Sequence, residues 1–169
     1  MMSELVVVGV DPGPMPGICA LYWLSPEQVR PASAVYQCNH PAAVDLVEHL
    51  LNWGADRRVL AIERFVSGPR SSRLNSPISA QITRELITAL TSLRTTLACE
   101  VVLRSAAEVK PWGSDERLDA CGLIETTRGM PHARDAARHA LHAAVWAAGQ
   151  VDPLGSLWRS GLKGSDQGE

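Results

Sequence analysis

Three strand-like segments joined by short turns come before the first helix of this chain. The first, LVVVGV, is a run of apolar and mostly β-branched residues that favours a buried strand. Strands joined by short turns pair antiparallel, whereas strands separated by a helix run parallel. The strand-like segments are 5–10, 18–24 and 29–37, followed by 58–65 and 99–105, each of which comes after a helical segment. We therefore expect an α/β fold with a five-stranded mixed sheet, three antiparallel strands and then two parallel ones, flanked by helices.

Helix signals lie between and after these strands. Pro41 in the first turn and Gly54 beyond the end delimit one helix. Apolar residues recur at spacings of three and four from Ile78 to Leu97, which predicts a long amphipathic helix with one apolar stripe. Ser114 is placed to cap a further helix whose first turn holds two acids. The expected helices span 41–53, 77–97, 114–124 and 130–149, with a turn or a short helix at 106–113.

Composition narrows the class of protein. A length of 169 residues suits one domain, and we expect it at 1–150, with a flexible tail at 151–169. The net charge of −2 argues against nucleic-acid binding through bulk charge but leaves room for a local basic patch. The four cysteines show no CxxC pairing, which favours reduced, buried thiols in the cytoplasm over disulfides or a zinc site. No secretory signal and no apolar run of about 18 residues is present, so we expect no membrane association.

Three acids occupy unusual places in this pattern. Asp11 ends the first strand, Glu63 lies inside the apolar stretch LAIERF, and Asp135 opens the last helix. A carboxylate in or at the end of a buried strand is costly unless it is paired or binds a metal. Mg²⁺ prefers such oxygen ligands, so the acids suggest a site for a hard cation. Each acid alone also has an ordinary explanation, as a turn former, a salt-bridge partner or part of a solvated helix face.

The last helix concentrates side chains that can bind a metal. At 100° per residue, three histidines, one aspartate and one tryptophan of this helix fall within an arc of roughly 80°. A solvated stripe would also give this arc, but together with Asp11 and Glu63 it predicts half of a divided site. The residues on the arc are His132, Asp135, His139, His142 and Trp146.

The motifs VVVGVDPGPMPGICAL, LAIERF, QITRELITAL, VKPWGSDERL and HARDAARHALHAA resemble, in order and spacing, those of the RuvC-type Holliday junction resolvases, especially the small phage-encoded ones. The resemblance implies an RNase H-like fold, a homodimer, and cleavage of four-way DNA junctions with Mg²⁺ or Mn²⁺ in a bacterial cell. Asp11 and Glu63 match the acids of the first and fourth strands, and His132 and Asp135 match the pair on the last helix. Two positions depart from the family pattern. Pro14 stands where Ser or Thr is usual, and Val66 stands where relatives carry a loop aromatic, one residue after Phe65.

The resemblance therefore implies a catalytic and metal-binding set that holds two ions about 3.5–4 Å apart. The set consists of Asp11, Glu63, His132 and Asp135. Asp11 would bridge the ions, Glu63 and Asp135 would flank them, and His132 would either ligate a metal or position the attacking water. His139, one turn beyond Asp135, is expected to support the ligands.

A basic region accompanies the predicted site. Six basic and two acidic residues lie between Arg64 and Arg104, which favours contacts to DNA phosphates. The apolar stripe of the helix at 77–97 is the expected dimer interface. The predicted DNA-binding residues are Arg64, Phe65, Arg70, Arg73, Lys110 and Trp112.

Other functions fit parts of the pattern. An actin-like sugar kinase also begins with a strand ending in Asp-x-Gly, but such kinases usually need two such domains. A junction-binding protein without catalysis would not need every metal-site position. A related RNase H-like nuclease acting on RNA–DNA hybrids or other branched DNA remains open, because the same site serves all these substrates.

Overall fold

The computed structural model describes residues 4–25, 28–67 and 76–155. Its core is a five-stranded sheet in the order β3-β2-β1-β4-β5. The strands β1, β2 and β3 are antiparallel neighbours, whereas β4 and β5 run parallel to β1. The predicted mixed sheet is therefore confirmed. The strands span Leu5–Asp11, Gly17–Trp23, Ala32–Gln37, Arg57–Glu63 and Glu100–Arg104.

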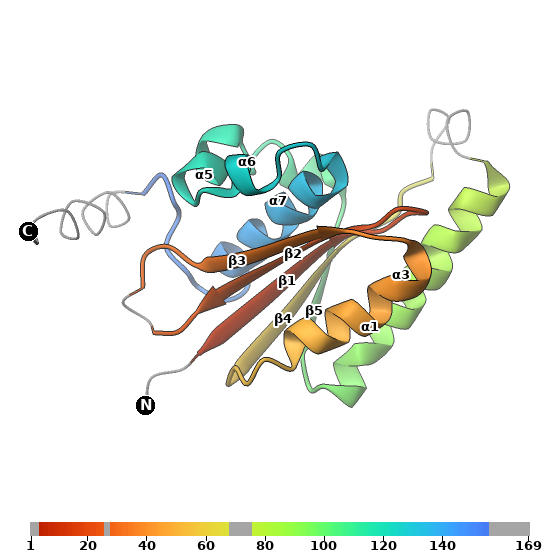
Figure 1. The fold of residues 1–169 in the computed structure, drawn as a ribbon, viewed down its shortest axis with the longest axis horizontal. Coiled ribbons are helices and arrows are strands. Elements are labelled where there is room, and N and C mark those ends of the chain that lie inside the picture. Colours follow the sequence, from red (N-terminus) through yellow and green to blue (C-terminus); the bar gives the residue numbers. More distant parts are fainter. Residues whose placement is uncertain (1–3, 26–27, 68–75, 156–169) are drawn as a thin grey trace, which may run out of the picture.

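Helices cover both faces of the sheet, as Figure 1 shows. The helices α1 and α3 pack on one face, and α7, with the short helices α5 and α6, lies on the other. The alternation of side chains along β1 divides the core accordingly: Val6, Val8 and Val10 face α1 and α3, while Leu5 and Val7 face α7. The helices are α1 (His40–Leu51), α3 (Pro77–Thr96), α4 (Ala106–Val109), α5 (Asp115–Ala120), α6 (Leu123–Thr126) and α7 (Pro131–Trp146).

Two helix predictions differ from the structure. The helix expected at 114–124 begins at its predicted cap, Ser114, but is divided into α5 and α6. Gly122 lies between them with a φ of 74°, a left-handed conformation that ends a helix and suits glycine. Most of the apolar stripe of α3 belongs to the core, because Leu86, Leu90 and Leu93 are buried beside α1, whereas Ile78 at its start is 70% exposed. The dimer interface expected on this helix stays a prediction, with less exposed apolar surface than the stripe suggested.

The first residues of the expected tail are held in place. Asp152 accepts two hydrogen bonds of 2.9 Å from the Arg117 guanidinium, and Pro153 is buried. The remainder of that tail lies outside the described residues. Among the helices that the structure describes, none has the length and apolarity needed to cross a membrane.

Candidate active site

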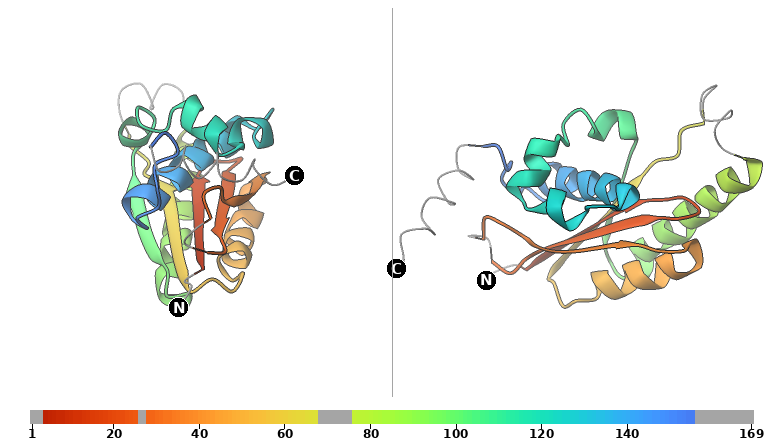
Figure 2. Two further views of the ribbon diagram at one scale, coloured as in Figure 1. Left: turned by 90° about the vertical axis from the view of Figure 1, so that its left-hand side faces the viewer. Right: turned by 45° about the horizontal axis from the view of Figure 1, so that its top comes forward.

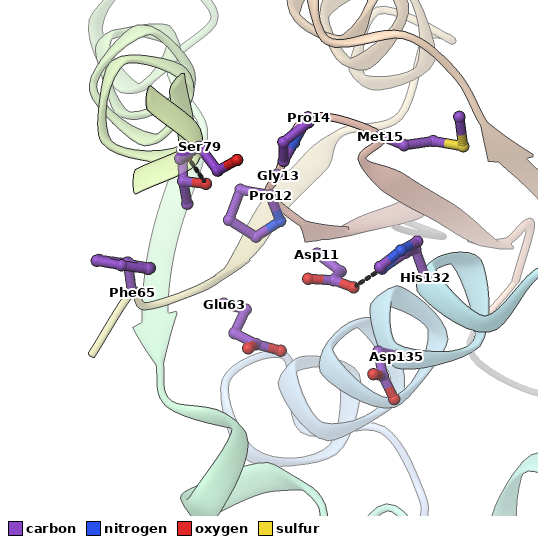
Figure 3. A pocket seen from close by; sticks show the side chains of 11 residues that line it. Asp11, Pro12, Gly13, Pro14, Met15, Glu63, Phe65, Ser79, His132 and Asp135 are labelled. Carbon is purple, nitrogen blue, oxygen red and sulfur yellow. Dashed lines mark hydrogen bonds and ion pairs between the residues drawn. The ribbon is translucent and has the colours of Figure 1, made fainter. Parts of the chain in front are cut away.

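A cavity of about 290 Å³ opens where the ends of β1 and β4 meet the start of α7. Figure 3 shows this cavity with the side chains around it. All four residues of the predicted catalytic set line it, so the acids that lie far apart in the sequence do come together. The full lining is Asp11, Pro12, Gly13, Pro14, Met15, Glu63, Phe65, Ser79, Thr83, His132 and Asp135.

The fold explains this convergence. Since β1 and β4 are parallel neighbours, their last residues, Asp11 and Glu63, reach the same edge of the sheet. Two glycines allow α7 to lie directly on the strands. A methyl group at Gly9 would lie 2.1 Å from the Ala136 carbonyl oxygen, and one at Gly17 would lie 2.0 Å from the His132 carbonyl oxygen. The right-hand view of Figure 2 shows α7 along the sheet in this close position.

Asp11 and His132 form the first contact of the site. Asp11 Oδ2 lies 2.9 Å from His132 Nδ1. The Asp11 side chain is only 14% exposed, and burial raises its pKa to about 6. The hydrogen bond from His132 lowers the pKa in part, whereas the nearby charges of Glu63 and Asp135 raise it. The two further carboxylates are thus close enough to disfavour a charge on Asp11.

The backbone of His132 is hydrogen-bonded to Gln37, the last residue of the edge strand β3. Its N–H donates to Gln37 Oε1 at 3.3 Å. This hydrogen bond satisfies one of the free N–H groups at the start of α7, where the cap residue Met130 offers no side-chain acceptor. The edge strand β3 therefore helps to fix the start of α7 beside Asp11.

Glu63 has a buried partner behind the cavity. Its Oε2 lies 3.1 Å from Nε2 of His139, one turn further along α7 than Asp135. His139 is 2% exposed, so this pair is sheltered from solvent on the histidine side. The predicted support role for His139 stays a prediction, but the contact it needs is present.

Asp135 accepts hydrogen bonds from two positively charged side chains. Lys110 Nζ lies 2.9 Å from its Oδ2, and Arg138 Nη1 lies 2.6 Å from its Oδ1. Arg138 also donates to the Gly113 carbonyl and to Asp115, which fixes its guanidinium. Figure 3 shows the Asp135 carboxylate pointing away from Asp11. Sequence reasoning missed Arg138, although its i,i+3 spacing to Asp135 on a helix was a usable signal.

Of the predicted DNA-binding residues, Phe65 lines the cavity, and Lys110 contacts Asp135 of the cavity lining. Arg64 is exposed and lies 3.6 Å from Glu108, and Arg84 Cζ lies 5.1 Å from the centre of the Phe65 ring. Trp112 is half-buried beneath Arg117, against the core on the α7 side. Lys110 is exposed apart from its contact with Asp135. Arg70 and Arg73 lie outside the described residues.

The types of side chain that line the cavity suit a hard divalent cation. Three carboxylates and one imidazole line a single cavity, and oxygen-rich sets of this type bind Mg²⁺ or Mn²⁺. In the described part of the chain, however, no three such side chains are arranged to hold an ion as they stand. The hydrogen bonds given above explain this, because each carboxylate is bonded to a basic side chain of the protein instead.

Comparison with known proteins gives a fold. The chain matches no protein-family model and no curated protein sequence. It is similar to the solved structure of RuvC from Thermus thermophilus in complex with Holliday junction substrate, with a TM-score of 0.57. The fold is that of RuvC. The sequences are 17% identical, and the match covers 85% of this chain and 95% of the RuvC chain.

A second structure of Thermus thermophilus RuvC gives the same result. Its TM-score is 0.55 at 18% identity, with 88% of this chain and 99% of that chain covered. The resemblance to RuvC seen in the sequence motifs, with its RNase H-like fold, is thus confirmed at the level of the fold.

Proposed function

We propose that this protein is a metal-dependent endonuclease that nicks branched DNA, with the four-way Holliday junction as its substrate. The observation that carries the proposal is the convergence of Asp11, Glu63, His132 and Asp135 on one cavity of a RuvC fold. The RuvC neighbour bound to a Holliday junction supports this substrate. The protein would act in the cytoplasm of a bacterial cell, and a phage genome is one place from which its gene could come.

The metal-binding residues would be the three carboxylates, with Asp11 as the central ligand. When bound, Mg²⁺ or Mn²⁺ supplies an activated water and stabilises the leaving oxygen of the phosphodiester. Asp11 is central because it is the most buried of the three and is influenced by both other carboxylates. Asp135 has to turn from Lys110 and Arg138 towards Asp11 to take part.

His132 has two possible roles in this scheme. Its Nδ1 is engaged with Asp11, so Nε2 is the nitrogen that can meet a metal or a water molecule. Half of the His132 side chain is exposed, which leaves it accessible to a bound phosphodiester. Either role requires the ring to stay beside Asp11, and the contact from Gln37 serves that purpose.

DNA would reach the cavity across the basic residues around it. We propose Arg64, Phe65, Lys110 and Trp112 as contacts, together with Arg70 and Arg73 of the segment between β4 and α3. Phosphate contacts of this kind position a duplex without reading its sequence. Lys110 is notable because a DNA phosphate would compete with Asp135 for its ammonium group.

The first experiment compares labelled substrates in Mg²⁺ or Mn²⁺: a four-way junction, a Y-fork, an RNA–DNA hybrid and a linear duplex. We expect nicking of the junction above all others. The Asp11→Asn variant should lose this activity and keep its DNA affinity, since the change removes a metal-binding charge and no phosphate contact. Binding is measured by gel shift in the absence of metal.

The alternatives give different results. Preferential cleavage of the fork or the hybrid would assign the site to another RNase H-like nuclease. Junction binding without cleavage in either metal would identify a non-catalytic junction-binding protein. Cleavage by Asp11→Asn at the wild-type rate would refute the site itself.

A further inference from the structure

The buried residues of α7 are mostly alanines, and His139 is the one buried residue of this helix with a polar side chain. The apolar ones are Ala133, Ala136, Ala137, Ala140, Leu141, Ala143 and Ala144. An imidazole placed in such surroundings costs free energy unless it is hydrogen-bonded. A leucine or valine would fill the same space without that cost, so burial alone does not explain a histidine at this position.

The contact with Glu63 supplies the reason. The His139 Nε2 lies 3.1 Å from Glu63 Oε2. An ionised carboxylate only accepts hydrogen bonds, so Nε2 is the donor of this contact when Glu63 is ionised. A carboxylate offers about four acceptor positions on its two oxygens, so the hydrogen bond leaves Glu63 free to bind elsewhere.

The two histidines near the site differ in their placement. His132 lines the cavity with half of its side chain exposed, whereas His139 touches Glu63 but is not among the described residues that line the cavity. Glu63 thus stands between the cavity and His139. A residue placed in this way can act on a ligand of the cavity only through Glu63.

We propose that His139 is a positioning residue that holds the Glu63 carboxylate in the orientation needed to bind a divalent cation. This inference rests on the proposed function, because it takes Glu63 as a metal ligand. Groups that hydrogen-bond to metal ligands fix the ligand's orientation, and their loss typically weakens metal binding by about 10- to 100-fold. The competing explanation is that His139 only fills the core.

The test measures metal binding and stability separately in the DNA-free protein. Free Mn²⁺ is followed by electron paramagnetic resonance, and thermal unfolding is followed in EDTA. We expect His139→Leu to unfold at or above the wild-type temperature and to bind Mn²⁺ at least about tenfold more weakly. His139→Gln, whose amide can donate in place of Nε2, should recover most of the affinity.

Activity provides a second readout. Junction nicking by His139→Leu should return towards the wild-type rate when the Mn²⁺ concentration is raised, because the defect lies in affinity. If the leucine variant does not fold, His139→Met replaces it, since the flexible methionine side chain adapts to an irregular space. Wild-type Mn²⁺ affinity in a folded leucine or methionine variant overturns the proposal.

Two further variants separate this inference from the proposed function. His142→Leu changes a neighbouring histidine of α7 that packs against Trp112 and Trp146, and it should leave Mn²⁺ affinity unchanged. Asp11→Asn should abolish Mn²⁺ binding. Undiminished binding by Asp11→Asn would refute the proposed site, whereas loss in Asp11→Asn without loss in His139→Leu would refute only the role of His139.

Discussion

Asp11 is held in the protein at a cost to stability. Its pKa is raised from 3.8 to about 6, chiefly by burial, so the folded state binds the proton more tightly than the unfolded state does. Stability from this group is therefore fully present below pH 3.8 and is lost as the pH rises through 6. Such a cost is typical of groups kept for function.

We expect Asp11→Asn to stabilise the protein at pH 8. The asparagine carries no charge, so the variant avoids a penalty of about 3 kcal/mol, a net value that already includes the favourable His132 contact. Little difference is expected at pH 4. Urea unfolding in EDTA at both pH values measures the effect. A variant that is less stable than wild type by the same amount at both pH values would contradict it.

The sequence singled out Asp11 at the end of a strand, Glu63 inside an apolar strand and Asp135 at the start of the last helix. The resemblance to RuvC-type resolvases joined His132 to these acids as one predicted set. The sequence could not predict that Lys110 would bond to Asp135, because the two residues lie 25 positions apart and meet only in the folded protein. The division of α5 from α6 was within reach of the sequence, since Gly122 interrupts the helical pattern. The exact ends of helices and strands were not predicted, as for the last helix, which was expected at 130–149 and spans Pro131–Trp146.

At the scale of elements, the site depends on how closely α7 approaches β1. Gly9 has no side chain where a methyl group would lie 2.7 Å from the Ala140 nitrogen as well as 2.1 Å from the Ala136 oxygen. Both atoms belong to the α7 backbone, which cannot move aside as a flexible side chain could. The helix that carries His132 and Asp135 is therefore positioned by a glycine of the strand that carries Asp11.

We expect Gly9→Ala to cost at least about 2 kcal/mol of stability and to abolish nicking, because it forces α7 away from β1. Gly13→Ala is the matched control. It lies in the turn after β1 with nothing within 4 Å of an added methyl group, and its stability should stay within about 0.5 kcal/mol of wild type. Equal stability of the two variants by urea unfolding would show that α7 adjusts freely.

In the described part of the chain, the proposed catalytic residues line one cavity, whereas resolving a four-way junction requires a nick in each of two strands. The sequence resemblance implied a homodimer, and two-fold symmetry would supply the second cavity. The buried leucines of α3 take up the middle of the surface first expected to form the interface and leave Ile78 exposed. Dimerisation is therefore proposed from the requirement for two nicks and is best tested through the products.

A supercoiled plasmid that extrudes a cruciform distinguishes the two possibilities. If the active unit is a dimer, the wild-type protein should convert the plasmid directly to linear DNA, because both nicks occur within one complex. Mixing the wild type with about a ninefold excess of inactive Asp11→Asn should change the main product to nicked circles, since most active complexes would then hold one working site. If each chain acts alone, nicked circles accumulate first even with the wild type, and the inactive variant slows the reaction without changing its product.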